Sequence, residues 1–169
     1  SLSPYTQEEI IARDYLVQEK PDVIIDVVDA TNLERNLYLT VQLSELGIPM
    51  VVALNIYDEA EKMGYRIDIE SMGRMLGIKI LPTVATKNAG LGALLKAAVE
   101  IADDPRSHQP KPLHYGEDIE TAAQAIAAQI NADYPSLAGK YPDRWLAYTL
   151  MEGNDLMLRE ISLPLGALL

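Results

Sequence analysis

Residues 23–29 read VIIDVVD and residues 49–56 read PMVVALNI, and these two apolar runs decide the fold class. Both are short and rich in β-branched side chains, which is typical of strands buried on both faces of a parallel sheet. A third run of this kind covers residues 78–85. Helical patterns follow the three runs, at residues 33–46, 69–76 and 91–102. Because strand and helix alternate three times, we expect an α/β fold with a parallel, doubly wound sheet.

Capping motifs set the expected helix starts. Residues 6–9 (TQEE) and 31–34 (TNLE) have the spacing of a capping box, in which a Thr and a Glu three residues later satisfy free backbone groups of the first turn. We therefore expect one helix that runs to about Glu19 and is ended by Pro21. A second helix is expected to open at the Thr31 capping box.

The composition argues against several classes of protein. With 25 acidic and 14 basic residues the net charge is −11, and no cluster of Lys and Arg offers a footprint for a nucleic-acid backbone. No apolar run approaches the roughly 20 residues that span a bilayer. Cysteine is absent, so there is no disulfide framework and no thiolate metal site. His108 and His114 lack ligand spacing, so we expect surface histidines, no metal site and no nucleic-acid partner.

The sequence pattern changes near residue 103. Residues 103–112 contain three prolines and several charges, which is typical of a linker. Beyond them, apolar spacing predicts an amphipathic helix over residues 119–130 and another between Asp143 and Gly153. The expected organisation is an α/β domain over 1–103, a linker over 104–112 and a small all-α domain over 113–169.

Polar residues follow two of the expected strands, at the end where an open parallel sheet binds ligands. Residues 55–58 (NIYD) follow one strand, and residues 85–87 (ATK) end or follow the next. The carboxylate of Asp58 can accept hydrogen bonds from the N1 and N2 donors of guanine. A backbone N–H near Ala85 or Thr86 can donate to O6, and Asn55 can bond N7 and tie the two loops together. Adenine reverses the donor and acceptor pattern, so these loops predict a guanine pocket.

Two other interpretations of these loops stay open. Asn55 and Asp58 can simply cap the helix that follows them. Asp26 and Asp29 can form a metal-binding carboxylate pair, but alternation puts Asp26 within the strand and Asp29 at its end. We expect Asp29 to serve hydrogen bonds of the loop.

Several stretches resemble the cytoplasmic part of the bacterial ferrous-iron transport protein B family. Residues 1–9 (SLSPYTQEE) are similar to the segment just after the family's Asp-x-x-Gly motif, and residues 28–40 (VDATNLERNLYLT) to a highly characteristic stretch. Residues 52–60 (VALNIYDEA) resemble its base-recognition strand and loop. Residues 144–146 (RWL) and 150–155 (LMEGND) resemble its helical domain. The likeness covers most of the chain and is most specific over residues 28–60.

The resemblance implies a Ras-like GTPase domain fused to a helical bundle, ahead of a membrane permease domain. In this family the domain binds GTP and GDP, hydrolyses GTP slowly and regulates Fe(II) uptake. Residues 1–103 would be the C-terminal part of that GTPase domain, with residues 1–9 in its second switch, and 113–169 part of the helical domain. The residues that match the fourth and fifth GTPase motifs are Asn55 and Asp58, then Ala85, Thr86 and Lys87.

The resemblance also implies partners and a location. The partners are guanine nucleotide and the transporter's own membrane domain, with a homo-oligomer as a further possibility. The location is the cytoplasmic face of the bacterial inner membrane.

The sequence departs from the pattern of Ras-like proteins in two respects. Most Ras-like proteins have a lysine at the position of Ile56, and that lysine packs along the base. The ferrous-iron transport protein B family commonly lacks it too, so we expect weak nucleotide binding. The phosphate loop, first switch and Asp-x-x-Gly motif would precede Ser1 and are absent from these 169 residues. Because those motifs bind phosphate and Mg²⁺, we expect Mg²⁺ only with that upstream segment and no GTP hydrolysis by this chain alone. Their absence would also expose an edge of the sheet, which favours association.

Two rival functions remain. The chain can be a non-enzymatic interaction module, in which the acidic surface and helical tail recruit a partner. It can also be another doubly wound enzyme with Asp29 or Asp58 as catalytic carboxylate, which requires a second acid, base or metal ligand at a strand end. A phosphate-loop motif ahead of Ser1 in the native chain would favour the GTPase.

Overall fold

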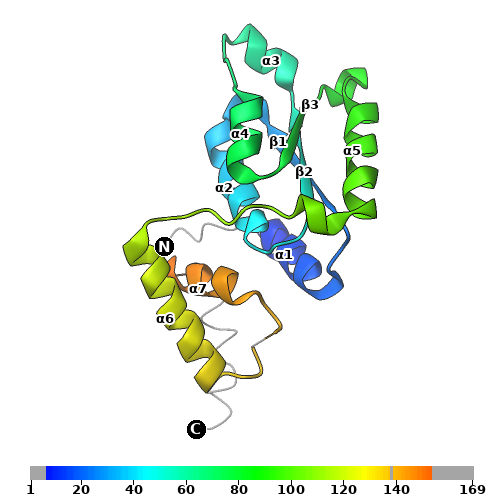
Figure 1. Cartoon of the computed structure of the whole chain (residues 1–169). Helices are drawn as coiled ribbons and strands as arrows, with labels where there is room; N and C mark the ends of the chain where they lie inside the picture. The colour runs from blue at the N-terminus through cyan, green and yellow to red at the C-terminus, as the bar shows by residue number, and fades with distance from the viewer. Residues whose placement is uncertain (1–6, 138, 154–169) are drawn as a thin grey trace. The chain divides into compact units, whose positions relative to one another are not determined.

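The computed structural model describes residues 7–137 and 139–153. The chain divides into two compact units (Figure 1). One unit comprises Lys20–Leu113, and α1 (Gln7–Glu19) is grouped with the residues from His114 onward. The helix predicted to end at Glu19 is confirmed, whereas Thr6 of its expected capping box lies outside the described residues. The expected boundaries at 103 and 113 stay predictions, although this division also separates the chain at residue 113.

A three-stranded parallel sheet forms the centre of the Lys20–Leu113 unit. Its strands lie in the order β1 (Ile24–Asp29), β2 (Met50–Asn55) and β3 (Lys79–Pro82). Asp29 pairs with Asn55 at the carboxyl ends of β1 and β2. Residues 50–54 of β2 are all buried, as the continuous apolar run predicts for a central parallel strand. The predicted parallel α/β fold is therefore confirmed.

Helices lie on both faces of this sheet, but the expectation that β1 is buried on both faces is wrong, because Ile25 and Val27 are 40% and 61% exposed. On one face, α2 (Leu33–Ser44) packs on β1, and α4 (Ile69–Leu76) packs on β3. On the other, α5 (Leu91–Asp103) packs on β2, where Val51 and Ala53 share a core with buried side chains of the helix. Figure 1 shows α4 and α5 on opposite sides of the strands. This arrangement is the predicted doubly wound one.

Asp26 is a buried carboxylate on the α2 face of the sheet. Its Oδ2 accepts a hydrogen bond of 2.6 Å from the Thr40 hydroxyl, and only 9% of the residue is exposed. Burial raises the pKa of Asp26, and the Thr40 hydrogen bond partly opposes that shift. The residue is thus held inside the strand, as alternation predicted.

The start of α2 differs from the expected capping box. Thr31 does not cap this helix, because its N–H and hydroxyl both donate to Asp29 Oδ1, at 2.8 and 2.7 Å. These bonds close a 3₁₀ turn over Ala30–Asn32, so α2 begins one residue later, at Leu33, with Asn32 as a cap that makes no side-chain bond. The capping-box prediction at Thr31 is therefore wrong, and Asp29 serves loop hydrogen bonds as expected.

Two elements near the sheet's carboxyl end also differ from the sequence pattern. A short helix, α3 (Tyr57–Lys62), follows β2 directly, and its N-cap position is taken by Ile56 and not by Asn55 or Asp58. The third strand ends at Pro82 instead of continuing to Ala85, and Ala85–Lys87 form a 3₁₀ turn. Proline has no N–H to donate, which is consistent with the strand ending there.

The proline-rich stretch is anchored to the α/β unit. Pro105–His108 form a 3₁₀ turn, and the Lys111 N–H donates to the carbonyl of Leu76 at 3.0 Å. Lys111 also passes so close to Gly77 that a Cβ there would lie 2.9 Å from its backbone nitrogen. A segment with linker composition is therefore ordered here by backbone contact.

The two predicted helices after the linker are confirmed as α6 (Glu117–Asp133) and α7 (Asp143–Met151). Glu120 of α6 is buried and receives two hydrogen bonds from the Arg144 guanidinium of α7, at 2.5 and 3.1 Å. Trp145 is 3% exposed and stacks on Tyr141, with ring centroids 5.4 Å apart. The charged pair thus joins α6 to α7, and the aromatic pair joins the segment before α7 to that helix. The last predicted segment, residues 160–169, lies outside the described residues.

The Glu120–Arg144 pair makes the stability of this unit depend on acidity. Hydrogen bonds from Arg144 and from the Tyr115 N–H lower the pKa of Glu120 from 4.5 to about 2. Because the folded pKa is the lower one, the stabilisation is present above about pH 4.5 and is lost as the pH falls toward 2. We expect Glu120→Gln to lower the melting temperature at pH 7 and to flatten its dependence on pH in that window.

Thermal melts followed by circular dichroism between pH 2 and 7 test this expectation. Glu117→Gln is the matched control, because it removes the same charge from the same helix at a side chain that is 91% exposed. Parallel pH profiles for Glu120→Gln and the wild type would contradict the assigned role of the pair.

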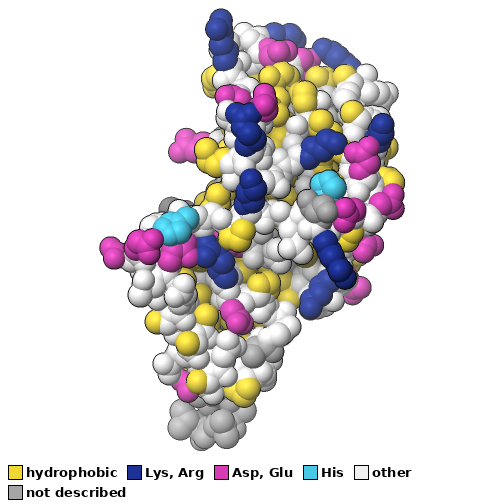
Figure 2. Space-filling view, viewed as in Figure 1, with side chains coloured by type: hydrophobic (Ala, Val, Ile, Leu, Met, Phe, Trp, Pro, Cys, Tyr) yellow, Lys and Arg dark blue, Asp and Glu magenta, His cyan; other side chains and the backbone are white. Residues whose placement is uncertain are grey.

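The surface carries both signs of charge. On the face shown in Figure 2, basic and acidic side chains are interspersed. Among the described residues, no helix is both long and apolar enough to cross a bilayer.

Candidate functional site: the carboxyl ends of β2 and β3

Two loops meet where β2 and β3 end. The first comprises residues 55–58, at the junction of β2 and α3, and the second comprises residues 83–90, between β3 and α5. Since β2 and β3 are parallel neighbours, both loops leave the same edge of the sheet. All five predicted site residues, Asn55, Asp58, Ala85, Thr86 and Lys87, belong to these two loops.

Asn55 ties the two loops together. Its Oδ1 accepts hydrogen bonds from the Ala85 N–H at 3.0 Å and from the Thr83 hydroxyl at 3.3 Å. Only the amide oxygen can accept a backbone N–H, so the acceptor assignment is fixed by chemistry. The amide nitrogen of Asn55 remains a donor of hydrogen bonds. The contact between the two loops that the sequence analysis expected is present, and the Ala85 N–H is its donor.

Thr83 is a positioning residue that the sequence analysis missed. It is 2% exposed, its N–H donates to the Leu54 carbonyl at 2.9 Å, and its own carbonyl accepts from the Tyr57 N–H at 3.3 Å. Together with its hydroxyl bond to Asn55, these contacts join the ends of both strands. The sequence feature that could have indicated this role is the presence of a polar Thr within the apolar run of residues 78–85.

Ile56 has a left-handed backbone, with φ 59° and ψ 28°. This conformation is unfavourable for a β-branched residue and costs roughly 1–2 kcal/mol. It turns the chain between Asn55 and the first residue of α3, so that Asp58 becomes the second residue of that helix. Strain of this kind is concentrated at ligand sites, and here it sets the position of the candidate carboxylate.

Asp58 and Lys87 form an ion pair across the two loops. Lys87 Nζ lies 2.5 Å from Asp58 Oδ2, and their side chains are 61% and 23% exposed. The hydrogen bond from Lys87 lowers the pKa of Asp58, with smaller contributions from the charges of Lys87 and Lys62. Asp58 is therefore a carboxylate, and hence an acceptor, near neutral pH.

The second loop has a tightly constrained backbone. Val84 and Ala89 form an isolated bridge, and Gly90 follows with φ 79°. A Cβ at Gly90 would lie 2.3 Å from the Pro82 carbonyl oxygen, so only glycine fits there without a shift of the backbone. The closed loop fixes the backbone positions of Thr86 and Lys87.

The Asn55 tie can be tested without any ligand. We expect Asn55→Ala to speed hydrogen exchange of the Ala85 amide, because its acceptor is removed, and to lower the free energy of unfolding by about 1 kcal/mol. Asn36→Ala is the matched control, because Asn36 bonds only within its own helix region, to the Asn32 carbonyl. Unchanged exchange at Ala85 in Asn55→Ala would contradict the tie.

A separate pocket of about 430 Å³ lies near the end of β1. It is lined by Ala30, Thr31, Asn32, Leu33, Glu34, Tyr65, Arg66 and Ile67. None of the five predicted site residues lines it. Within residues 7–137 and 139–153, no group of three or more His, Asp or Glu side chains is arranged to hold a metal ion.

Comparison with known families identifies the chain's relatives. The family model described as ferrous iron transport protein B matches residues 1–98, which is more than half of the chain. The chain belongs to the ferrous iron transport protein B family. A second model, described as the FeoB cytosolic helical domain, matches residues 115–168. The resemblance drawn from residues 28–60 is therefore confirmed, as is the expected order of an α/β part and a helical part.

Curated relatives are much longer than this chain. A fusion protein of Fe(2+) transport protein A and Fe(2+) transporter FeoB from Porphyromonas gingivalis is 44% identical over 161 residues, which cover 94% of this chain and 19% of that protein. The Fe(2+) transporter FeoB of Escherichia coli K12 is 40% identical over 148 residues, 87% of this chain and 18% of that protein. The chain thus spans less than a fifth of the length of these relatives.

Solved structures give the same result. The cytosolic domain of the T. maritima FeoB iron transporter in a GDP form matches with a TM-score of 0.79 at 29% identity, over 95% of this chain and 61% of that one. NFeoB from S. thermophilus bound to mGMPPNP matches with a TM-score of 0.75 at 36% identity, over 95% and 58%. The fold is therefore that of part of the cytosolic G domain of this family, followed by helices of its helical domain.

Proposed function

We propose that this chain is the base-binding part of a regulatory GTPase domain of a membrane Fe(II) transporter, and that it binds GTP and GDP through the two loops after β2 and β3. The observation that carries the proposal is the hydrogen bond from Ala85 N–H to Asn55 Oδ1. It joins the two loops into one site and leaves the side-chain nitrogen of Asn55 as a donor in the loop that also carries the acceptor Asp58.

Each polar edge of guanine finds a complementary group in this site. Asp58 accepts hydrogen bonds from N1 and N2, and the side-chain nitrogen of Asn55 donates to N7. Because the Ala85 N–H already donates to Asn55, we assign O6 to the N–H of Thr86 and give Ala85 a positioning role. Adenine would present N1 as an acceptor toward the Asp58 carboxylate, so the same groups disfavour it.

Nucleotide-bound relatives support this assignment. The S. thermophilus NFeoB structure holds mGMPPNP, a variant of the same protein holds GDP, and the T. maritima domain is in a GDP form. These nucleotides are bound by the relatives, and guanine-nucleotide binding is proposed for this chain by similarity.

We further propose that this chain alone does not hydrolyse GTP. Its 169 residues contain no Gly-x-x-x-x-Gly-Lys-Ser/Thr sequence, whose backbone N–H groups and lysine bind the phosphates in P-loop GTPases. We assign no magnesium ligand to the described residues, so Mg²⁺ enters this function only together with a phosphate-binding segment.

The proposed setting is a transporter in a bacterial inner membrane, with this chain at the cytoplasmic face. The membrane domain of the same transporter is then its partner, and self-association through the sheet edge is a further expectation. The match to a model for a cytosolic helical domain supports this setting.

Competition binding with GDP, IDP and ADP tests the proposed function. Hypoxanthine lacks the N2 amino group, so IDP loses one hydrogen bond to Asp58 but keeps O6, N1–H and N7. We expect the affinity order GDP, then IDP, then ADP, with each lost charge-assisted bond costing about tenfold or more. Equal affinities for GDP and ADP would contradict the guanine site and favour the interaction-module alternative.

A further inference from the structure

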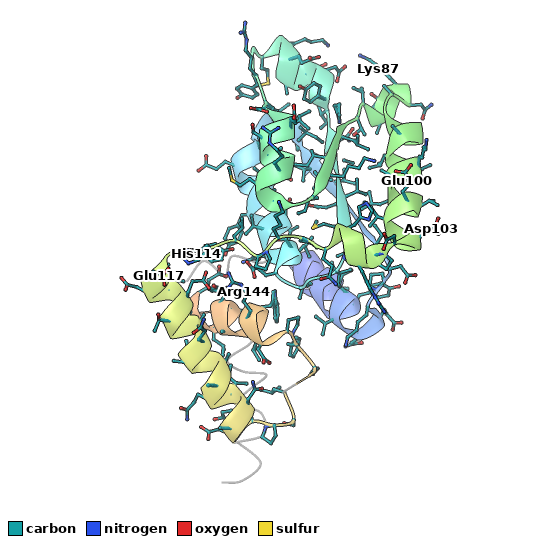
Figure 3. The ribbon with its side chains drawn as sticks, in the orientation of Figure 1. Lys87, Glu100, Asp103, His114, Glu117 and Arg144 are labelled. Atoms are coloured by element: carbon teal, nitrogen blue, oxygen red, sulfur yellow. The ribbon has the colours of Figure 1, made fainter. Side chains whose placement is uncertain are left out.

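The side chain of Lys87 contacts the carboxylate of Asp58, which is the group proposed to bind the base. Its Nζ donates to Asp58 Oδ2 at 2.5 Å, from a position 29 residues along the chain. Figure 3 shows Lys87 near the start of α5. The pair therefore bridges the loop that ends at α5 and the loop that begins α3.

This contact and the base use the same atoms. Guanine N1 and N2 need both oxygens of the Asp58 carboxylate if they bind side by side. An ammonium group 2.5 Å from Oδ2 takes one of the acceptor positions of that oxygen. The base and the lysine therefore compete for the same carboxylate oxygen.

The two partners differ in their freedom to move. Asp58 is part of α3 and its side chain is 23% exposed, whereas the side chain of Lys87 is 61% exposed. The backbone of Lys87 is fixed, because its N–H donates to the Val84 carbonyl at 3.0 Å and Gly90 closes the loop behind it. Only the lysine side chain needs to move to free the carboxylate.

We propose that Lys87 competes with the guanine base for Asp58: it pairs with this carboxylate in the empty site and leaves it when the base binds. This inference rests on the proposed function. It makes Lys87 a residue that weakens nucleotide binding and speeds release, because the ammonium returns to Asp58 as the base departs.

The size of the effect follows from the exposure of the pair. Exposed ion pairs are weak, so removing the competitor should tighten GDP binding by about two- to fivefold. Salt screens such pairs, so raising the ionic strength should also favour the base over Lys87. A variant without the ammonium should show a smaller dependence of GDP affinity on salt.

Lys87→Met is the variant that tests the competition, because it keeps a long unbranched side chain and removes the ammonium group with its charge and donors. Lys96→Met is the matched control, since Lys96 is 79% exposed on α5 and lies 3.9 Å from Glu100. GDP and ADP affinities are measured at low and high salt for the wild type and both variants. We expect tighter GDP binding in Lys87→Met alone, with ADP unaffected.

Carbon-13 NMR of the Asp58 carboxyl group gives an independent readout. In the nucleotide-free protein, Lys87→Met should raise the pKa of Asp58 toward its ordinary value, because the first cause of its lowering is removed. Equal or weaker GDP binding by Lys87→Met, or an unchanged pKa of Asp58, would overturn the competition. Failure of the wild type to prefer GDP over ADP would instead contradict the proposed function.

Discussion

Asp58→Asn is expected to shift the base preference of this chain from guanine to xanthine. Asparagine presents an N–H donor where aspartate presents a second acceptor. Xanthine carries a carbonyl oxygen at C2 where guanine carries an amino group, so the new donor meets a new acceptor. We expect GDP affinity to fall by about 100-fold, because two hydrogen bonds to a charged group are weakened or lost.

Binding of GDP and XDP to the wild type and to Asp58→Asn measures this exchange. Asp103→Asn is the control, because it removes one carboxylate at the exposed end of α5, away from the proposed pocket (Figure 3). If Asp58→Asn binds GDP as well as the wild type and gains nothing for XDP, then Asp58 does not contact the base.

Leu54→Ala is expected to cause a large loss of stability in the α/β unit. Leu54 is 0% exposed in the central strand, one residue before Asn55. Truncating a fully buried leucine removes its apolar contacts and leaves a cavity, which costs about 2–5 kcal/mol. Because Leu54 also accepts the Thr83 N–H through its backbone, the loops at the base site should loosen with the strand.

Urea denaturation of Leu54→Ala and Leu95→Ala tests this expectation, because the same leucine-to-alanine truncation is made at a buried and at an exposed position. Leu95 lies on α5 and is 60% exposed, so its truncation should change the free energy of unfolding by less than about 0.5 kcal/mol. Similar losses for the two variants would show that β2 is not the core of the unit.

The fold class followed from local pattern because the elements that define it are strongly periodic. The VIIDVVD and PMVVALNI runs form β1 and β2, and the predicted helix at 69–76 has those bounds in the structure. Short continuous apolar runs separated by helical patterns leave few choices for a chain that must bury them.

The elements that sequence analysis missed depend on contacts distant in the chain or on competing hydrogen bonds. The sequence of α3, YDEAEK, buries only Ala60, so it shows no helical stripe. The expected cap at Thr31 failed because Asp29 binds both of its donors. Spacing alone could not decide between these partners.

The candidate site was predictable as a set of residues but not as a geometry. Placement after two strands was enough to bring Asn55 and Ala85 together. It did not reveal that the Ala85 N–H donates its hydrogen bond to Asn55. It also did not reveal that Thr83 joins the ends of the two strands, or that Lys87 forms an ion pair with Asp58. These contacts depend on the conformations of the two loops. One of them is the left-handed backbone conformation of Ile56, which β-branched residues rarely adopt.

An NMR titration of the isotope-labelled chain with GDP, and with ADP as the reference, tests the central claim most directly. The guanine site predicts that GDP alone shifts the backbone amides of residues 55–58 and 85–87, with Thr86 among the most affected because its N–H binds O6. Amides in α6 should stay unchanged. Equal responses to both nucleotides, or shifts confined to other parts of the chain, would contradict a guanine site at the ends of β2 and β3.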